Sequence, residues 1–346
     1  MESASSAKAL LEGPRGRELS LEIARSASPS HPAEFYDTRR LLPPGLSRNA
    51  ERVLRMLTSV PEDLAISAAE LHKCLARVVR RAVYWRPPDE ISRLLAEPEV
   101  REALIPAAAA AMRSAGSDWW TQPSAPLQHY VQWIGSNVVQ GTGEVSLSGA
   151  RDKLKQWHGA ILVQRTNAPV AAGWTGRWWS GPALVGLPIT TSALPGSGPA
   201  GLSLVEDPLA WRQARTFPLR ARSGARIYEI DSPARWEELV RRYPLDVTLP
   251  RRAAWSKAAG TPEAETWFWR IPDWVAVSED FDGVHLTVQA YLRTAGSVVG
   301  TSYEKTMLAG WAPGETWWLT DILEAAGEPT DWQAAEGNEG WQVQRP

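Results

Sequence analysis

The stretch from Ala225 to Pro244 reads ARIYEIDSPARWEELVRRYP, and it sets the architecture expected for the second half of the chain. Its short apolar run predicts a strand over 225–230. Ser232 followed by Pro233 is a typical helix start, because serine caps free N–H groups and proline fits the first helical position. The helix then ends at Pro244. A strand leading straight into a helix indicates a sheet with helices packed on it.

A second unit follows, with a short helix predicted over 273–280 and a strand over 284–292. The strand's side chains alternate strictly, so its even-numbered residues form an apolar face and its odd-numbered residues a polar one. The polar face holds an imidazole, a hydroxyl, an amide and a phenol, whereas a face in contact with solvent usually selects Lys, Glu and Arg. These four side chains are His285, Thr287, Gln289 and Tyr291.

The acidic turn before this strand suggests acid–base chemistry. Asp282 beside His285 would form a proton-transferring pair, and Arg226 would bind a carboxylate or phosphate. The alternative is that these residues are structural. The histidine would then have its hydrogen bonds within the fold, the aspartate would accept hydrogen bonds from the backbone of the turn, and the arginine would form a cross-strand ion pair. The catalytic candidates are His285, Asp282, Asp280 and Tyr291, and the substrate-binding candidates are Arg226, Tyr228, Thr287, Gln289, Trp178 and Trp179.

The composition and the apolar pattern divide the whole chain into three parts. Residues 1–45 lack a sustained apolar period and predict a flexible tail. Residues 46–116 predict a helical region, and residues 117–346 a tryptophan-rich α+β region with the site-bearing module at 222–322. The fold class is therefore α+β, with a helical N-terminal part followed by a mixed, largely antiparallel sheet with helices packed on it. Further strands are expected at 161–163, 202–205, 303–311 and 316–320.

Composition and absent motifs narrow the class of protein. The 346 residues are 44% hydrophobic with a net charge of −2, which argues against a disordered chain and against a global basic field. Cys74 is the single cysteine, so there is no disulfide framework. The five histidines are far apart, and no metal site is expected. The sequence lacks phosphate-binding and dinucleotide-binding glycine motifs and identifies no cofactor. No targeting or membrane-spanning segment is recognised, which predicts a cytoplasmic protein without membrane contact.

Tryptophan is unusually frequent in this chain, and arginine is concentrated in a few stretches. The chain has 19 tryptophans but only 4 phenylalanines, so most tryptophans are expected in the core. Trp178 and Trp179 are candidates for a wall that stacks on a planar ligand. Basic stretches over 77–86, 211–226 and 241–257 would hold the phosphates of a nucleotide or of tRNA. Their structural alternative is a set of solvated helix faces with Arg–Trp stacking.

Segments 227–236, 271–274, 280–287 and 308–313 resemble a group of tryptophan-rich actinobacterial proteins of unassigned function. The likeness covers about the last third of the chain. It implies that these segments form one module, and it carries no catalytic residue over. The frequent Ala, Arg, Trp and Pro residues also fit a bacterial source with a high GC content.

Three functional hypotheses follow. The first is a cytosolic bacterial group transferase of specialised biosynthesis, with a small-molecule substrate and a phosphate-bearing donor (nucleotide-linked or aminoacyl-tRNA-like), acting by His/Asp chemistry. The second is an ADP-ribosyltransferase-like or NAD-cleaving enzyme that uses Arg226, Tyr228 and Glu229, although the order of residues that it requires is not met. The third is a non-catalytic binding or immunity-type protein with a tryptophan-rich contact surface.

Overall fold

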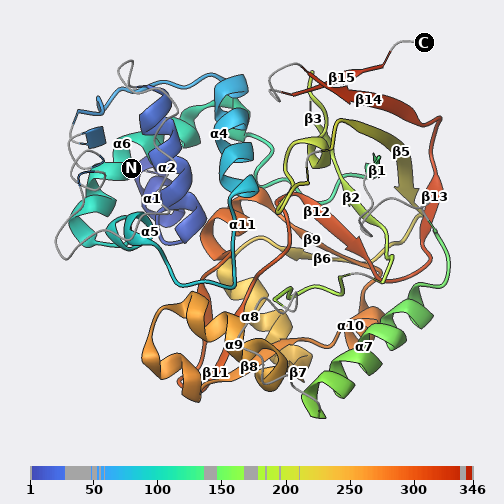
Figure 1. Ribbon diagram of the computed structural model, residues 1–346. Helices are drawn as coiled ribbons and strands as arrows, with labels where there is room; N and C mark the ends of the chain where they lie inside the picture. The colour runs from blue at the N-terminus through green and yellow to red at the C-terminus, as the bar shows by residue number, and fades with distance from the viewer. Residues whose placement is uncertain are drawn as a thin grey trace. The chain divides into compact units, whose positions relative to one another are not determined.

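The computed structural model describes residues 2–27, 48, 53, 56–57, 59–135, 146–166, 178–183, 185–194, 196–209, 211–335 and 340–344. The chain divides into two compact units, one of residues 1–78 and 88–119 and the other of residues 79–87 and 120–346. The described part of the first unit contains helices and no strand, and the second contains the sheets (Figure 1). The α+β class is confirmed.

The first unit begins with two helices where the sequence predicts a tail. The prediction for residues 1–45 is wrong over its first part, because Leu19 and Ile23 are fully buried. Arginine and glutamate pair with each other along the second helix, as Arg25 does with Glu22 at 3.0 Å, and this leaves an apolar face to pack. Residues 28–45 lie outside the described residues. The helices are α1 (Glu2–Leu10), α2 (Pro14–Ser26), α4 (Ala68–Arg80), α5 (Glu90–Leu94) and α6 (Pro98–Arg113).

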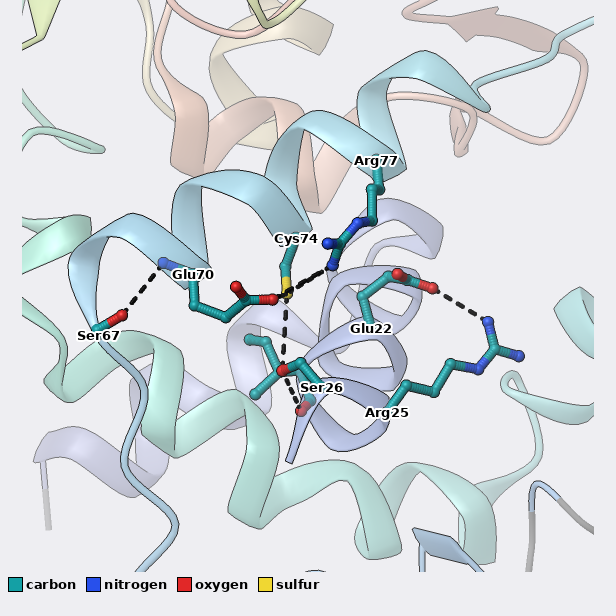
Figure 2. A network of polar contacts seen from close by, with 8 residues as sticks. Glu22, Arg25, Ser26, Ser67, Glu70, Cys74 and Arg77 are labelled. Atoms are coloured by element: carbon teal, nitrogen blue, oxygen red, sulfur yellow. Dashed lines mark hydrogen bonds and ion pairs between the residues drawn. The ribbon is translucent and has the colours of Figure 1, made fainter. Parts of the chain in front are cut away.

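A polar cluster around the buried Cys74 connects α2 with α4 in this unit (Figure 2). The Cys74 thiol lies 3.9 Å from the Ser26 hydroxyl and 3.8 Å from a Glu70 carboxylate oxygen, which also pairs with Arg77. Burial, together with the negative charge of Glu70, raises the pKa of Cys74 to about 12. The thiol is therefore inert at neutral pH, and its role here is packing.

The second unit is built on a nine-stranded sheet, which confirms the mixed, largely antiparallel prediction. All neighbouring strands are antiparallel except β6 and β9. The order is β15 (Trp341–Val343), β14 (Thr330–Ala334), β5 (Gln213–Ala221), β1 (Leu127–Ile134), β2 (Ile189–Thr191), β12 (Glu315–Trp318), β9 (Gly283–Leu286) and β6 (Ile227–Ile230), and β13 (Leu323–Ala325) pairs with β5.

A smaller sheet and several helices complete this unit, and α7, α8, α9 and α10 gather with the smaller sheet below the large one in Figure 1. The predicted strand–helix unit is confirmed as β6 and α8, with Ser232 as the N-cap. The small sheet contains β10 (Val298–Gly300), β11 (Glu304–Met307), β8 (Phe268–Pro272) and β7 (Pro244–Asp246). The helices are α7 (Ala150–Thr166), α8 (Pro233–Arg242), α9 (Thr248–Ala259), α10 (Trp274–Asp280) and α11 (Val288–Thr294).

The strand predicted over 284–292 is wrong in its second half. It ends at Leu286, and α11 begins at Val288. Thr287 is the N-cap, because its hydroxyl accepts a hydrogen bond from the Ala290 N–H at 3.1 Å. The polar row therefore does not continue along one strand. Residues 161–163 are likewise helical, within α7, and 202–205 form no strand.

Tryptophan supplies much of the core, as the sequence predicts. Ring pairs connect neighbouring elements, for example Trp274 with Trp311 at 5.6 Å between centroids. Every tryptophan among the described residues is buried or half-buried. The fully buried tryptophans are Trp120, Trp236, Trp255, Trp269, Trp274, Trp311 and Trp318.

Candidate active site

His285 pairs with Glu229 rather than with an aspartate. Strands β6 and β9 place the two residues side by side, and Nδ1 of His285 lies 2.5 Å from Oε2 of Glu229. The imidazole is 4% exposed. The strand register continues this polar row to Thr316 on β12 and Thr190 on β2.

The row is closed by further hydrogen bonds. The Ser124 N–H donates to Glu229 at 2.9 Å, and the Ser124 hydroxyl lies 3.1 Å from that of Thr316. Gln128 and the Trp318 indole complete the chain of contacts through Thr190. A hydrogen-bonded network of this kind helps to fix strand register. The contacts of His285 are those expected of the structural alternative, and its catalytic role stays a prediction.

Asp282 and Arg226 lie just before β9 and β6 and hold the beginnings of the two strands together. The Asp282 carboxylate accepts hydrogen bonds from the Arg226 N–H at 2.9 Å and from the Thr320 hydroxyl at 3.0 Å. Burial alone would raise the pKa of Asp282, but these bonds and the Arg226 guanidinium hold it below its ordinary value. Arg226 is thus occupied by an ion pair, and no His–Asp dyad forms.

The other predicted site residues near these strands also have local partners. Asp280, exposed at the end of α10, accepts hydrogen bonds from Tyr243 and Arg242, which lower its pKa. Tyr228 is buried and donates to the Arg235 carbonyl at 2.8 Å. The main-chain N–H of Gln289 donates to Trp120. Because Tyr228 and Glu229 are neighbours on a strand, they face opposite sides, and the residue set of the NAD-cleaving hypothesis does not assemble.

Three predicted residues do lead to a cavity. A pocket of about 420 Å³ opens on the other face of the large sheet, and Trp178 and Trp179 line it. Gly310 makes room for this wall, because a Cβ there would lie 1.7 Å from Cδ1 of Trp179. Tyr291 reaches the pocket through Glu206, to which its hydroxyl donates. Polar and charged residues of the lining include His129, Lys153, Thr191, Glu206, Asp207 and Glu315, and further aromatic ones Trp133, Trp211 and Trp317.

Glu315 lies at the centre of the polar lining. The register places it beside Thr191 on β2, which in turn lies beside His129 on β1. Its carboxylate accepts a hydrogen bond from the Ala312 N–H at 3.1 Å. Burial raises its pKa to about 8, and the negative charge of Glu206 adds to the shift. At pH 7 the protonated form of such a group outnumbers the ionised form by about ten to one.

Glu206 is the second glutamate in the lining of this pocket. One oxygen of its carboxylate accepts hydrogen bonds from the hydroxyls of Tyr84 and, at 2.8 Å, Tyr291. Hydrogen bonds to an ionised carboxylate stabilise it. The next residue, Asp207, has a φ of +48°, which is uncommon for a residue other than glycine and is a form of strain that often occurs at functional sites. The pocket therefore combines a carboxyl group of raised pKa, Glu315, with a second carboxyl group that two tyrosine hydroxyls contact.

The remaining polar lining offers hydrogen bonds to a ligand. Buried ring nitrogens of His129, Trp178 and Trp211 have no hydrogen-bond partner among the described residues. Burial lowers the pKa of His129, so its imidazole is neutral at neutral pH. Burial also lowers the pKa of Lys153, whose ammonium donates to the Gly186 carbonyl at 3.0 Å.

Sequence reasoning missed the two glutamates because their surroundings are assembled from distant segments. A local signal existed for Glu315, which is the single charged residue in the run GETWWL. Glu206 had no comparable signal, since its tyrosine partners are far away in the sequence. Across the described segments, no group of three or more His, Cys, Asp or Glu residues is placed to hold a metal ion.

Comparison of the chain with protein-family models, with curated proteins and with solved structures finds no match. In the part of the chain that the structure describes, no helix is long and apolar enough to cross a membrane.

Proposed function

We propose that the protein is an enzyme that cleaves or transfers a glycosyl group bound in the pocket of Glu315 and Glu206. The observation that carries this proposal is that two carboxyl groups, those of Glu315 and Glu206, line one pocket beside a tryptophan wall. Such pairs divide the roles of acid and base in glycoside chemistry. Flat tryptophan faces suit the apolar faces of a sugar ring, and the unpartnered ring nitrogens suit its hydroxyls.

The raised pKa of Glu315 makes it the proton donor of the pair, and Glu206 takes the other role. Glu315 donates its proton to the glycosidic oxygen as the bond to the sugar carbon breaks, and the leaving group departs as an alcohol. The Glu206 carboxylate stabilises the positive charge that develops on the sugar. An acceptor hydroxyl then adds to the sugar carbon and returns a proton to the Glu315 carboxylate. With water as the acceptor the reaction is hydrolysis, and with another hydroxyl it is transfer of the glycosyl group.

The acidic lining affects the choice of substrate. Glu206 and Asp207 face one lysine, which disfavours a phosphate beside them. A neutral glycoside is therefore the favoured substrate of this pocket. The phosphate-bearing donor, the tRNA partner and the cytoplasmic location stay predictions. Several arginines of the basic stretches lie in ion pairs, including Arg215 with Asp331 at 2.6 Å.

The experiment is a panel of nitrophenyl glycosides assayed by release of nitrophenolate. We expect Glu315→Gln to lower the rate by about 10²- to 10⁴-fold on 4-nitrophenyl substrates. The loss should be much smaller on 2,4-dinitrophenyl substrates, because that leaving group needs little protonation. Glu206→Gln should lower both rates. Exposed Glu324→Gln is the matched control.

Two results would overturn the proposal. One is equal activity of the wild-type protein and Glu315→Gln on both substrate types. The other is the absence of turnover together with no thermal stabilisation by any sugar of the panel, since a ligand that binds the native state raises its stability.

A further inference from the structure

A second hollow of about 240 Å³ adjoins the glycosyl pocket within the second unit. The two share Trp133, Val205 and Trp211 in their linings. Trp341 and Arg80 line only the second hollow, and Arg80 belongs to the same unit of the chain. A ligand that occupied both hollows would lie across the shared tryptophans.

The walls of the second hollow suit a flat ring. Trp133 and Trp211 are stacked with centroids 4.6 Å apart and planes only 9° apart. Trp341 contacts Trp133 at 5.4 Å, with the ring planes inclined by 50°. The buried indole nitrogen of Trp211 has no hydrogen-bond partner among the described residues. Aromatic faces beside an unpartnered indole N–H indicate a planar, largely apolar group that carries a polar substituent.

The charge of this hollow is opposite to that of the first. Arg80 is the one charged residue in its lining, at an exposed position, and it forms no ion pair with any residue that the structure describes. A guanidinium binds carboxylate, sulfonate or phosphate groups through its planar fork of donors. The first pocket, by contrast, is lined by Glu206, Asp207 and Glu315.

We infer that this second hollow is a binding subsite for a planar aromatic group with an anionic substituent, held by Trp341, the Trp133–Trp211 stack and Arg80. Its role as the subsite for the leaving group or the acceptor rests on the proposed function of the neighbouring pocket. The complete substrate would then be a glycoside with an acidic aromatic aglycone. Binding of the aromatic anion itself does not depend on catalysis.

The test measures binding of naphthalene-2-sulfonate and of neutral 2-naphthalenemethanol to the full chain by isothermal titration calorimetry. The sulfonate should bind more tightly than the alcohol. Arg80→Ala should weaken sulfonate binding by about two- to fivefold, the range of exposed ion pairs, and leave the alcohol unchanged. Trp341→Ala should weaken both by about fivefold. Arg220→Ala, an exposed arginine that lines neither hollow, is the control.

The inference is overturned if the alcohol binds as tightly as the sulfonate, or if Arg80→Ala and Arg220→Ala have equal effects. If Trp341→Ala does not fold, the comparison of Arg80→Ala with Arg220→Ala is sufficient to test the inference. Failure of the proposed function gives a different pattern: turnover is absent, whereas sulfonate binding keeps its dependence on Arg80. Conversely, turnover lost in Glu315→Gln together with no sulfonate binding rejects the subsite and keeps the function.

Discussion

Replacing Glu315 with glutamine should change how the stability of the protein depends on pH. Glutamine has nearly the same shape and keeps an oxygen for the Ala312 N–H, but it does not titrate. In the folded protein, burial and the neighbouring Glu206 carboxylate raise the pKa of Glu315 to about 8 from an ordinary value of 4.5. In the unfolded chain both influences are lost. The protonation equilibrium is therefore coupled to folding.

The sign of the effect follows from which state holds the proton. Between pH 4.5 and about 8 the folded protein keeps the Glu315 proton while the unfolded chain releases it. The stability contributed by this group is fully present below pH 4.5 and is lost as the pH rises through that window. At about 1.4 kcal/mol per pKa unit the total is roughly 5 kcal/mol.

The assay is guanidinium unfolding of the wild-type protein, Glu315→Gln and the control Glu324→Gln at intervals from about pH 5 to pH 8. The free energy of unfolding of Glu315→Gln, minus that of the wild-type protein, should increase by about 3 kcal/mol over this range. The control should show no such increase, because Glu324 is exposed on β13. If the difference for Glu315→Gln stays constant with pH, Glu315 titrates near its ordinary value and the proton-donor role has no basis.

Two further predictions concern stability. Deletion of residues 2–26 removes buried Leu19 and Ile23 and should lower Tm by more than ten degrees or abolish folding, as measured by circular dichroism; a shift of a few degrees would show that these helices contribute little. His285→Ala removes the partner of Glu229 and should cost about 2 to 3 kcal/mol in urea unfolding, with a smaller added cost in the double variant with Glu229→Ala. Additive costs would mean that the pair contributes nothing to stability.

The parts of the fold that could be predicted from sequence are those with local start and stop signals. Ser232 and Pro233 mark the beginning of α8, and Asp273 caps α10 through the N–H groups that follow it. Each signal acts within about four residues, so it operates in the same way whatever surrounds the helix. The α+β class followed from these units and from the turn-rich texture of the second half.

The prediction for the segment after β9 was wrong because its apolar pattern fits both the period of a strand and that of a helix. Apolar residues at every second position from Val284 predict a strand, but Val288 and Leu292 are also four residues apart, which is the spacing of one helix face. Thr287 decides between the two by capping the helix. The N-terminal helices were missed for a related reason. A few apolar residues among many charged ones are enough to form a packed helix when the charged residues pair with each other.

The site was missed because alternation along a strand gives a sheet two polar faces with different roles. Glu315 and Thr316 are adjacent, so they point to opposite sides. Thr316 joins the row that includes His285, where hydrogen bonds connect side chains of several segments to one another. Glu315 joins the row of Thr191 and His129, which lines the pocket. A polar residue in a strand can therefore belong either to a structural hydrogen-bond network or to a ligand pocket. Which of the two it joins depends on the register between strands that are far apart in the sequence.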